Sequence, residues 1–283
     1  MHRIELAIPS GAPHPRGLVA EFFRRDALYA GAAAILIVAI GPTLTSWALD
    51  DRLLDGVAVW IKPLKFQLAL AVYLATLAWF AGWMPAAVAG ARHYRIFAAM
   101  VVACVAAEMV WIVGAAALGE ASHFNVVTPA RQAIYSAMGA AAVMLTSASL
   151  VQGVVILRAR DGGGDPALRL AIGLGLVLNF ALTVPVAGYL SSRAGHLVGA
   201  DPATVRRLAV FGWARDGGDL RVAHFLATHA MHALPALGWL AARALAPRAA
   251  RIAVLAGAAV YAALVAWTFA LALMGQPFLP WLG

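Results

Sequence analysis

The sequence predicts an all-α integral membrane protein, a seven-transmembrane-helix bundle with its N-terminus inside and its C-terminus outside. Hydrophobic residues make up 63% of the 283 residues and charged residues only 12%. A soluble domain carries charge on about a quarter of its residues, because its surface faces water. Runs of about 20 apolar residues, enough for a helix to cross a bilayer, recur along the chain. The composition therefore argues against a soluble globular fold.

Seven runs have the length and apolar content of a transmembrane span. They lie near 27–49, 64–84, 96–118, 132–157, 168–190, 222–245 and 252–275. The sixth run is the weakest, because it contains three histidines and Pro235. The first run follows an arginine-rich start and also resembles a cleaved signal peptide, which would leave six spans. We favour a span, because the apolar run is longer than that of a typical leader.

Region 27–275 is expected to form one transmembrane domain, between a cytoplasmic N-terminal segment (1–26) and a C-terminal tail (276–283). Twelve of the 21 Lys and Arg residues fall on the side of the N-terminus in this arrangement, and nine fall on the other side. Such an excess marks the cytoplasmic side. The only long loop, 191–221, is expected to cap the outer mouth of the bundle. These features indicate a multi-pass protein of a bacterial cytoplasmic membrane.

Charge and cysteine content exclude two classes of function. The formal net charge is +8, but the arginines are spread over short loops and form no basic face, so we expect no nucleic-acid partner. Cys104 is the only cysteine, which excludes an internal disulfide framework and a cysteine-only zinc site.

The sixth span carries the most unusual polar residues of the chain. Ionisable groups inside a span are costly, so they indicate function by default. On a helix, the polar groups of this span form a stripe that descends from the outer interface to mid-bilayer. The stripe consists of Arg221, His224, Thr228 and His232, with His229 to one side. Asp219, which precedes the stripe, is expected to be the N-cap of the helix.

A carboxylate in the third span adds a second candidate group. Glu108 lies near the centre of that span, and His123 follows the span on its outer side. We expect both to converge with the histidines of the sixth span on one cavity. His123, His224, His229 and His232 are then candidate metal ligands, and His224 or His229 a candidate haem ligand. Glu108 and Arg221 are the candidate catalytic residues.

Two lysines and an asparagine near the outer interface form a third candidate group. Lys62 and Lys65 open the second span and are the only lysines of the chain. They are typical of interfacial anchors, but they also suit the attraction of an anionic headgroup or substrate. Asn125 lies in the next outer loop and is a further candidate for this role.

Three motifs carry a resemblance to known sequences. They are WIKPLKF (60–66), SHFN (122–125) and GDLRVAHF (218–225). With them, the chain resembles a group of uncharacterised bacterial polytopic membrane proteins over about residues 55 to 240. The resemblance implies no established activity. In that group the position of His232 is more often Gln, which implies larger roles for Glu108, His123, His224 and His229.

The sequence leaves three functions open. The first is a metal- or haem-dependent membrane enzyme that acts on a lipid-like or small substrate, with zinc, iron or haem in the outer half of the bundle. The second is a proton-coupled transporter or channel that uses the same His, Glu and Arg residues. The third is a structural membrane subunit, in which the polar stripe only packs. A retinal protein is excluded, because residues 252–275 contain no lysine.

Overall fold

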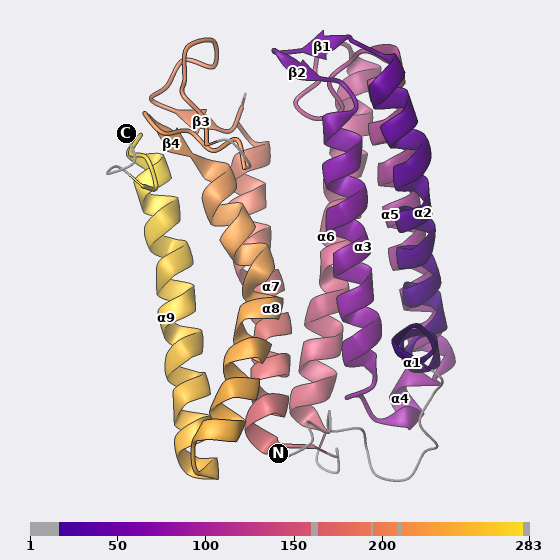
Figure 1. The fold of residues 1–283 in the computed structure, drawn as a ribbon, viewed down its shortest axis with the longest axis vertical. Helices are drawn as coiled ribbons and strands as arrows, with labels where there is room; N and C mark the ends of the chain where they lie inside the picture. The colour runs from indigo at the N-terminus through magenta and orange to yellow at the C-terminus, as the bar shows by residue number, and fades with distance from the viewer. Residues whose placement is uncertain (1–16, 160–163, 194, 209–210, 280–283) are drawn as a thin grey trace.

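The computed structural model describes residues 17–159, 164–193, 195–208 and 211–279. The first sixteen residues of the predicted N-terminal segment and the last four of the predicted tail lie outside the described residues. In the described part, seven long helices run side by side along the long axis of the molecule (Figure 1). They are α2 (Ala27–Leu49), α3 (Ile61–Ala81), α5 (Arg92–Leu118), α6 (Pro129–Arg158), α7 (Pro166–Ser191), α8 (Leu220–Ala244) and α9 (Pro247–Leu273). The predicted all-α architecture is confirmed.

Local sequence explains where several of these helices begin and end. Side-chain oxygens of Asp26, Thr128, Asp165 and Asp219 accept hydrogen bonds from backbone N–H groups in the first turns of α2, α6, α7 and α8. An N-cap of this kind satisfies donors that have no partner inside the helix. Gly119 ends α5 in the left-handed conformation, with φ of 71°, which glycine adopts without strain. The predicted N-cap role of Asp219 is confirmed.

Six helices are long and apolar enough to cross a membrane by length and composition: α2, α3, α5, α6, α7 and α9. The chain is therefore a multi-pass membrane protein by these criteria. α8 has 25 residues but is not among the six, because its histidines and arginines lower its apolar content. This is the span that the sequence already indicates as the weakest.

The helices form two groups that meet where α6 packs against α7. On one side α2, α3 and α5 pack against one another and α6, and on the other α8 packs between α7 and α9. Glycines allow close approach at these contacts. A Cβ atom at Gly153 of α6 would lie 2.8 Å from the Gly173 carbonyl oxygen, and one at Gly175 would lie 2.9 Å from the Ala230 carbonyl oxygen. The predicted neighbourhood of the third and sixth spans is wrong, because α5 and α8 belong to different groups.

A short helix that the sequence did not predict, α1 (Leu18–Arg25), lies across one end of the bundle (Figure 1). Its Glu21 is buried and binds Arg24 and Arg25 at 2.7 and 2.6 Å. These partners, Arg24 first, lower the pKa of Glu21 to about 2. Arg25 lies 3.9 Å from the ring centre of Trp79 and donates to its carbonyl oxygen. A short helix α4 (Ala86–Ala89) lies at the same end.

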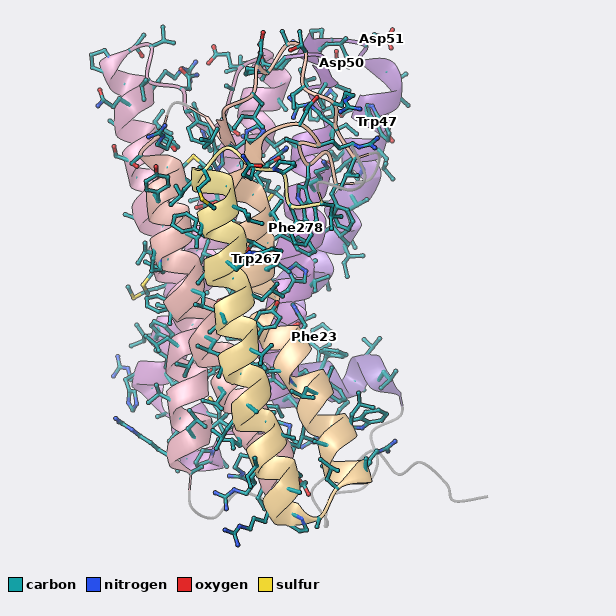
Figure 2. All side chains as sticks on the ribbon, turned by 90° about the vertical axis from the view of Figure 1, so that its left-hand side faces the viewer. Phe23, Trp47, Asp50, Asp51, Trp267 and Phe278 are labelled. Carbon is teal, nitrogen blue, oxygen red and sulfur yellow. The ribbon has the colours of Figure 1, made fainter. Side chains whose placement is uncertain are left out.

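The opposite end carries two small hairpins. β1 (Leu53–Leu54) pairs with β2 (Val57–Ala58), and β3 (Leu197–Val198) pairs with β4 (Gly218–Asp219), both antiparallel. We call this the outer end and the α1 end the inner end. Asp50 and Asp51 lie at the outer end and Phe23 lies towards the inner end (Figure 2).

The long loop between α7 and α8 sits on the outer ends of α8 and α9. The ring of Trp213 contacts Phe225 of α8 at 5.3 Å and Phe278 at 6.0 Å. β3 and β4 both contact α9. In the described residues the loop therefore packs mainly over one helix group, rather than over the centre of the bundle as expected.

Candidate functional site

The polar stripe of α8 is present as the periodicity predicts. The His229 ring stacks on Phe225 with centroids 3.9 Å apart, and it lies 5.4 Å from the His232 ring. His229 Nδ1 is 2.7 Å from the Phe225 carbonyl oxygen, so this nitrogen is the donor and Nε2 is left as the acceptor. His224 is half-buried and has no hydrogen-bond partner among the described residues.

His232 joins the two helix groups. Its Nε2 lies 3.0 Å from the hydroxyl of Thr76 on α3. Because the Thr76 hydroxyl donates to the Val72 carbonyl oxygen at 2.7 Å, the imidazole is the donor in this contact. His232 Nδ1 is then an acceptor, and it is buried without a partner among the described residues. His232 lies twelve residues into α8, which is about 18 Å along the helix.

Further polar contacts lie around Thr76, and those of α6 and α5 lie nearer the inner end. Tyr73 lies one turn from Thr76 on the same face of α3, and its hydroxyl donates to the carbonyl oxygens of Leu145 and Thr146 at 2.8 and 3.4 Å. The Ser149 hydroxyl donates to the same Thr146 oxygen at 2.9 Å. Ser149 in turn accepts from the side-chain amide of Asn179 on α7 at 2.9 Å. This cluster links α3, α6 and α7.

The contacts reach the inner end through a glutamine, a tyrosine and an aspartate. Gln152 lies one turn from Ser149 on α6 and donates to the Tyr94 hydroxyl at 2.9 Å. The Tyr94 hydroxyl lies 3.4 Å from Asp26 Oδ2 and donates to it. Burial raises the pKa of Asp26. Gln152 Oε1 and the neighbouring Tyr29 hydroxyl are buried and have no hydrogen-bond partner among the described residues.

These residues together are called the buried polar chain. Its members are His224, His229, His232, Thr76, Tyr73, Ser149, Asn179, Gln152, Tyr94 and Asp26. Of these residues, the sequence indicated only the three histidines of α8. A lone tyrosine or amide inside an apolar run is not distinctive, so the sequence offered no signal for the inner half.

The outer end holds a second group, formed by Lys62, His123 and His196. His123 packs against Phe66 and Tyr135 at ring distances of 5.4 and 6.2 Å. Burial, followed by the charge of Lys62, lowers the pKa of His123 to about 3. Burial and then the Arg221 charge lower the pKa of His196 to about 4, with a smaller contribution from Lys62.

The charge of Lys62 therefore acts on two imidazoles from two separate loops. His196 Nε2 is buried without a partner among the described residues. His196 was not predicted as a site residue, and only its place in the long loop drew attention to it. Lys65 is exposed.

Glu108 is buried in α5, with 5% of its surface exposed. It has no hydrogen bond or ion pair to any described residue, and no contact joins it to the histidines of α8. Glu108 and the histidines of α8 lie in different helix groups, because α5 packs with α2, α3 and α6 whereas α8 packs with α7 and α9. Over the described residues, no group of three or more His, Cys, Asp or Glu side chains is arranged to hold a metal ion.

Two other predicted residues, Arg221 and Asn125, have structural partners. Arg221, a predicted catalytic residue, binds Asp219 at 2.6 Å and the Gly212 carbonyl oxygen at 2.5 Å, which fastens the outer loop to α8. Asn125 donates to the Ala121 carbonyl oxygen at 3.1 Å within its own loop. In the outer loop, Asp216 accepts from Arg206 at 3.2 Å.

Comparison with known proteins adds no identification. The chain matches no protein-family model, no curated protein and no solved structure.

Proposed function

We propose that α8 is a seventh span and that the inner end faces the cytoplasm of a bacterium. α8 lies beside α7 and α9 and is of similar length (Figure 1). Only two residues, Leu245 and Ala246, connect α8 to α9. The inner end carries Arg24, Arg25, Arg92, Arg95, Arg158, Arg169, Arg243, Arg248 and Arg251. This arginine excess supports the cytoplasmic assignment by the positive-inside rule.

We propose that the protein moves protons across the membrane, as a proton-coupled transporter or channel. The observation that carries the proposal is the buried polar chain, whose polar groups lie on α8, α3, α6, α7 and α5 and end at Asp26. Polar groups in spans are expensive, because lipid offers them no partners. A series of them across several helices, joined by hydrogen bonds at some steps and by one helical turn at others, is better explained by transport than by packing at one contact.

The chemistry of the chain suits proton transfer. A neutral imidazole has one donor and one acceptor nitrogen, so it takes up a proton on one side and releases one on the other. His232 presents its donor nitrogen to Thr76 and its acceptor nitrogen to the interior. Buried polar atoms such as His232 Nδ1, Gln152 Oε1 and the Tyr29 hydroxyl are normally satisfied by ordered water. Water at these atoms would bridge the steps between the side chains.

A metal- or haem-dependent enzyme is the second candidate. The observation that favours it is the contact of His229 Nδ1 with the Phe225 carbonyl oxygen, because a ligating histidine needs this kind of orienting partner. A metal enzyme has less support than a proton path, because no three His, Cys, Asp or Glu side chains among the described residues are grouped to hold a metal ion. Metal analysis and the visible absorption spectrum of the purified protein test this candidate directly.

Flux measurements in liposomes test the proton proposal. The full chain is reconstituted with a pH-sensitive dye inside, and a membrane potential is imposed with and without a gradient of a small carboxylate. We expect proton flux above protein-free liposomes in at least one condition. His232→Leu and Tyr94→Phe should lower the flux to the protein-free level, because each removes one member of the chain.

His93→Gln is the matched control, because His93 is an exposed histidine of α5 that lies outside the chain. It should keep the wild-type flux. Absence of wild-type flux in both conditions contradicts the proposal. So does a wild-type flux that His232→Leu and Tyr94→Phe leave unchanged while both variants remain folded and monodisperse.

A further inference from the structure

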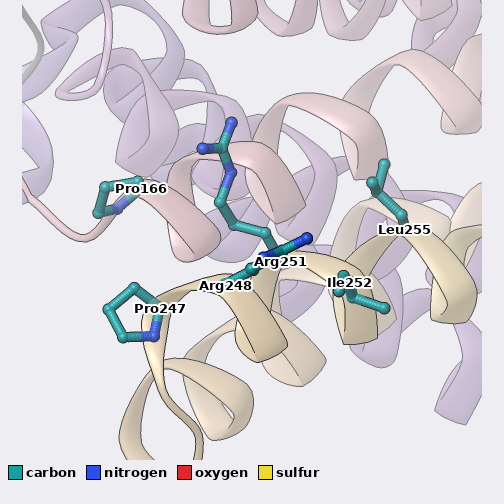
Figure 3. A pocket seen from close by; sticks show the side chains of 6 residues that line it. All are labelled: Pro166, Pro247, Arg248, Arg251, Ile252 and Leu255. Carbon is teal, nitrogen blue, oxygen red and sulfur yellow. The ribbon is translucent and has the colours of Figure 1, made fainter.

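A pocket of about 480 Å³ lies at the inner end, between the first turns of α7 and α9 (Figure 3). Its lining residues are Pro166, Pro247, Arg248, Arg251, Ile252 and Leu255. A second pocket of about 320 Å³ adjoins it and shares Pro166 and Arg251. Arg169 lines this second pocket. The two hollows therefore form one concave region with three arginines at its wall, which we call the inner groove.

The described residues that line the inner groove carry charge of one sign. Among them, no acidic residue lines either pocket. The carboxylate nearest in sequence, Asp165, accepts from the backbone N–H groups of Ala167 and Leu168. Arg248 and Arg251 are exposed, and neither has a hydrogen bond or ion pair to a described residue. Two unpaired guanidinium groups at one hollow are complementary to an anion with several oxygens, such as a phosphate.

The groove is apolar on the side that faces the membrane centre. Ile252 is 58% exposed and Leu255 is 53% exposed. On a helix, residues 248, 251, 252 and 255 share one face, and successive turns are about 5.4 Å apart. Arginine side chains at the interface are therefore followed, one turn deeper, by exposed aliphatic side chains. This order of charge and hydrocarbon matches a lipid and not a free anion.

We propose that the inner groove binds an anionic phospholipid, with the headgroup phosphate between Arg248 and Arg251 and an acyl chain along Ile252 and Leu255. Basic pockets between helices on the cytoplasmic side are suited to such headgroups. A zwitterionic lipid fits less well, because its own ammonium group is repelled by the arginines. The inference does not depend on the proton proposal, since the groove lies apart from the buried polar chain.

The test measures lipid retention by the detergent-purified full chain. The protein is incubated with phosphatidylglycerol or phosphatidylcholine, and bound lipid is counted by native mass spectrometry. We expect the wild type to retain phosphatidylglycerol in preference to phosphatidylcholine. The double variant Arg248→Gln/Arg251→Gln should retain one phosphatidylglycerol fewer. Inorganic phosphate at the same concentration should not displace the lipid.

Arg92→Gln/Arg95→Gln is the matched control, because it removes two arginines from the same end of the bundle but outside the groove. It should retain phosphatidylglycerol like the wild type. Equal loss in both double variants would assign the effect to overall charge and overturn the site. Equal binding of the two lipids, or displacement by inorganic phosphate, would also overturn it. A fold measurement by circular dichroism excludes unfolding of the variants as the cause.

Discussion

Acidification is expected to destabilise the protein through His123 and His196. Burial holds the pKa of His123 at about 3 and that of His196 at about 4, whereas an exposed histidine has a pKa of about 6.5. Below pH 6.5 the unfolded chain takes up protons at these two residues and the folded protein does not. The neutral imidazoles therefore make their full contribution to the free energy of unfolding above pH 6.5. This contribution is lost as the pH falls towards their folded pKa values.

The size of the effect follows from these values. Each pH unit between the unfolded and folded pKa is worth about 1.4 kcal/mol for each histidine. Between pH 6.5 and 5.0 each histidine should therefore lower the free energy of unfolding by about 2 kcal/mol. The window ends at pH 5, because ordinary carboxylates titrate below it. The charged groups that act on His196 are Arg221, Asp219, Arg207 and Lys62.

Thermal unfolding of the detergent-solubilised protein at pH 6.5 and 5.0 provides the assay. His123→Gln and His196→Gln should each reduce the fall of the unfolding midpoint, because glutamine does not titrate. His93→Gln, at an exposed position, should leave the fall unchanged. The reasoning is refuted if the wild type and both site variants lose the same stability between the two pH values.

Three further predictions follow from other contacts. Asp219→Ala should lower the free energy of unfolding by about 3 kcal/mol, because it removes the N-cap of α8 and the carboxylate that pairs with Arg221; chemical denaturation checks this, and a cost near zero would contradict it. Gly153→Leu should lower the free energy of unfolding by about 1 to 3 kcal/mol, because the added Cβ would lie 2.8 Å from a carbonyl oxygen of α7. A thermal unfolding midpoint equal to that of the wild type would argue against the α6–α7 contact. Reporter fusions after Arg95 should read cytoplasmic and fusions after Gly275 periplasmic; a cytoplasmic signal from both would contradict seven spans.

Much of the helical framework is predictable from sequence, because it depends on local properties. Apolar length sets the positions of the spans, and the cap at Asp219 depends only on the residues that follow it. The polar stripe of α8 follows from a period of 3.6 residues. α1 was missed, because its stability comes from tertiary contacts such as that of Arg25 with Trp79 rather than from eight residues of helix propensity.

The pairing of the helices was decided by tertiary structure. In a membrane, apolar side chains contact lipid as favourably as one another, so hydrophobicity does not select the neighbours of a span. Close contacts do, and here they depend on small residues such as Gly153 and Gly175, which bring α6, α7 and α8 together. This pairing separates Glu108 from the histidines that the sequence grouped with it. It also places His232 against Thr76, a contact between residues 156 positions apart that no local pattern indicates.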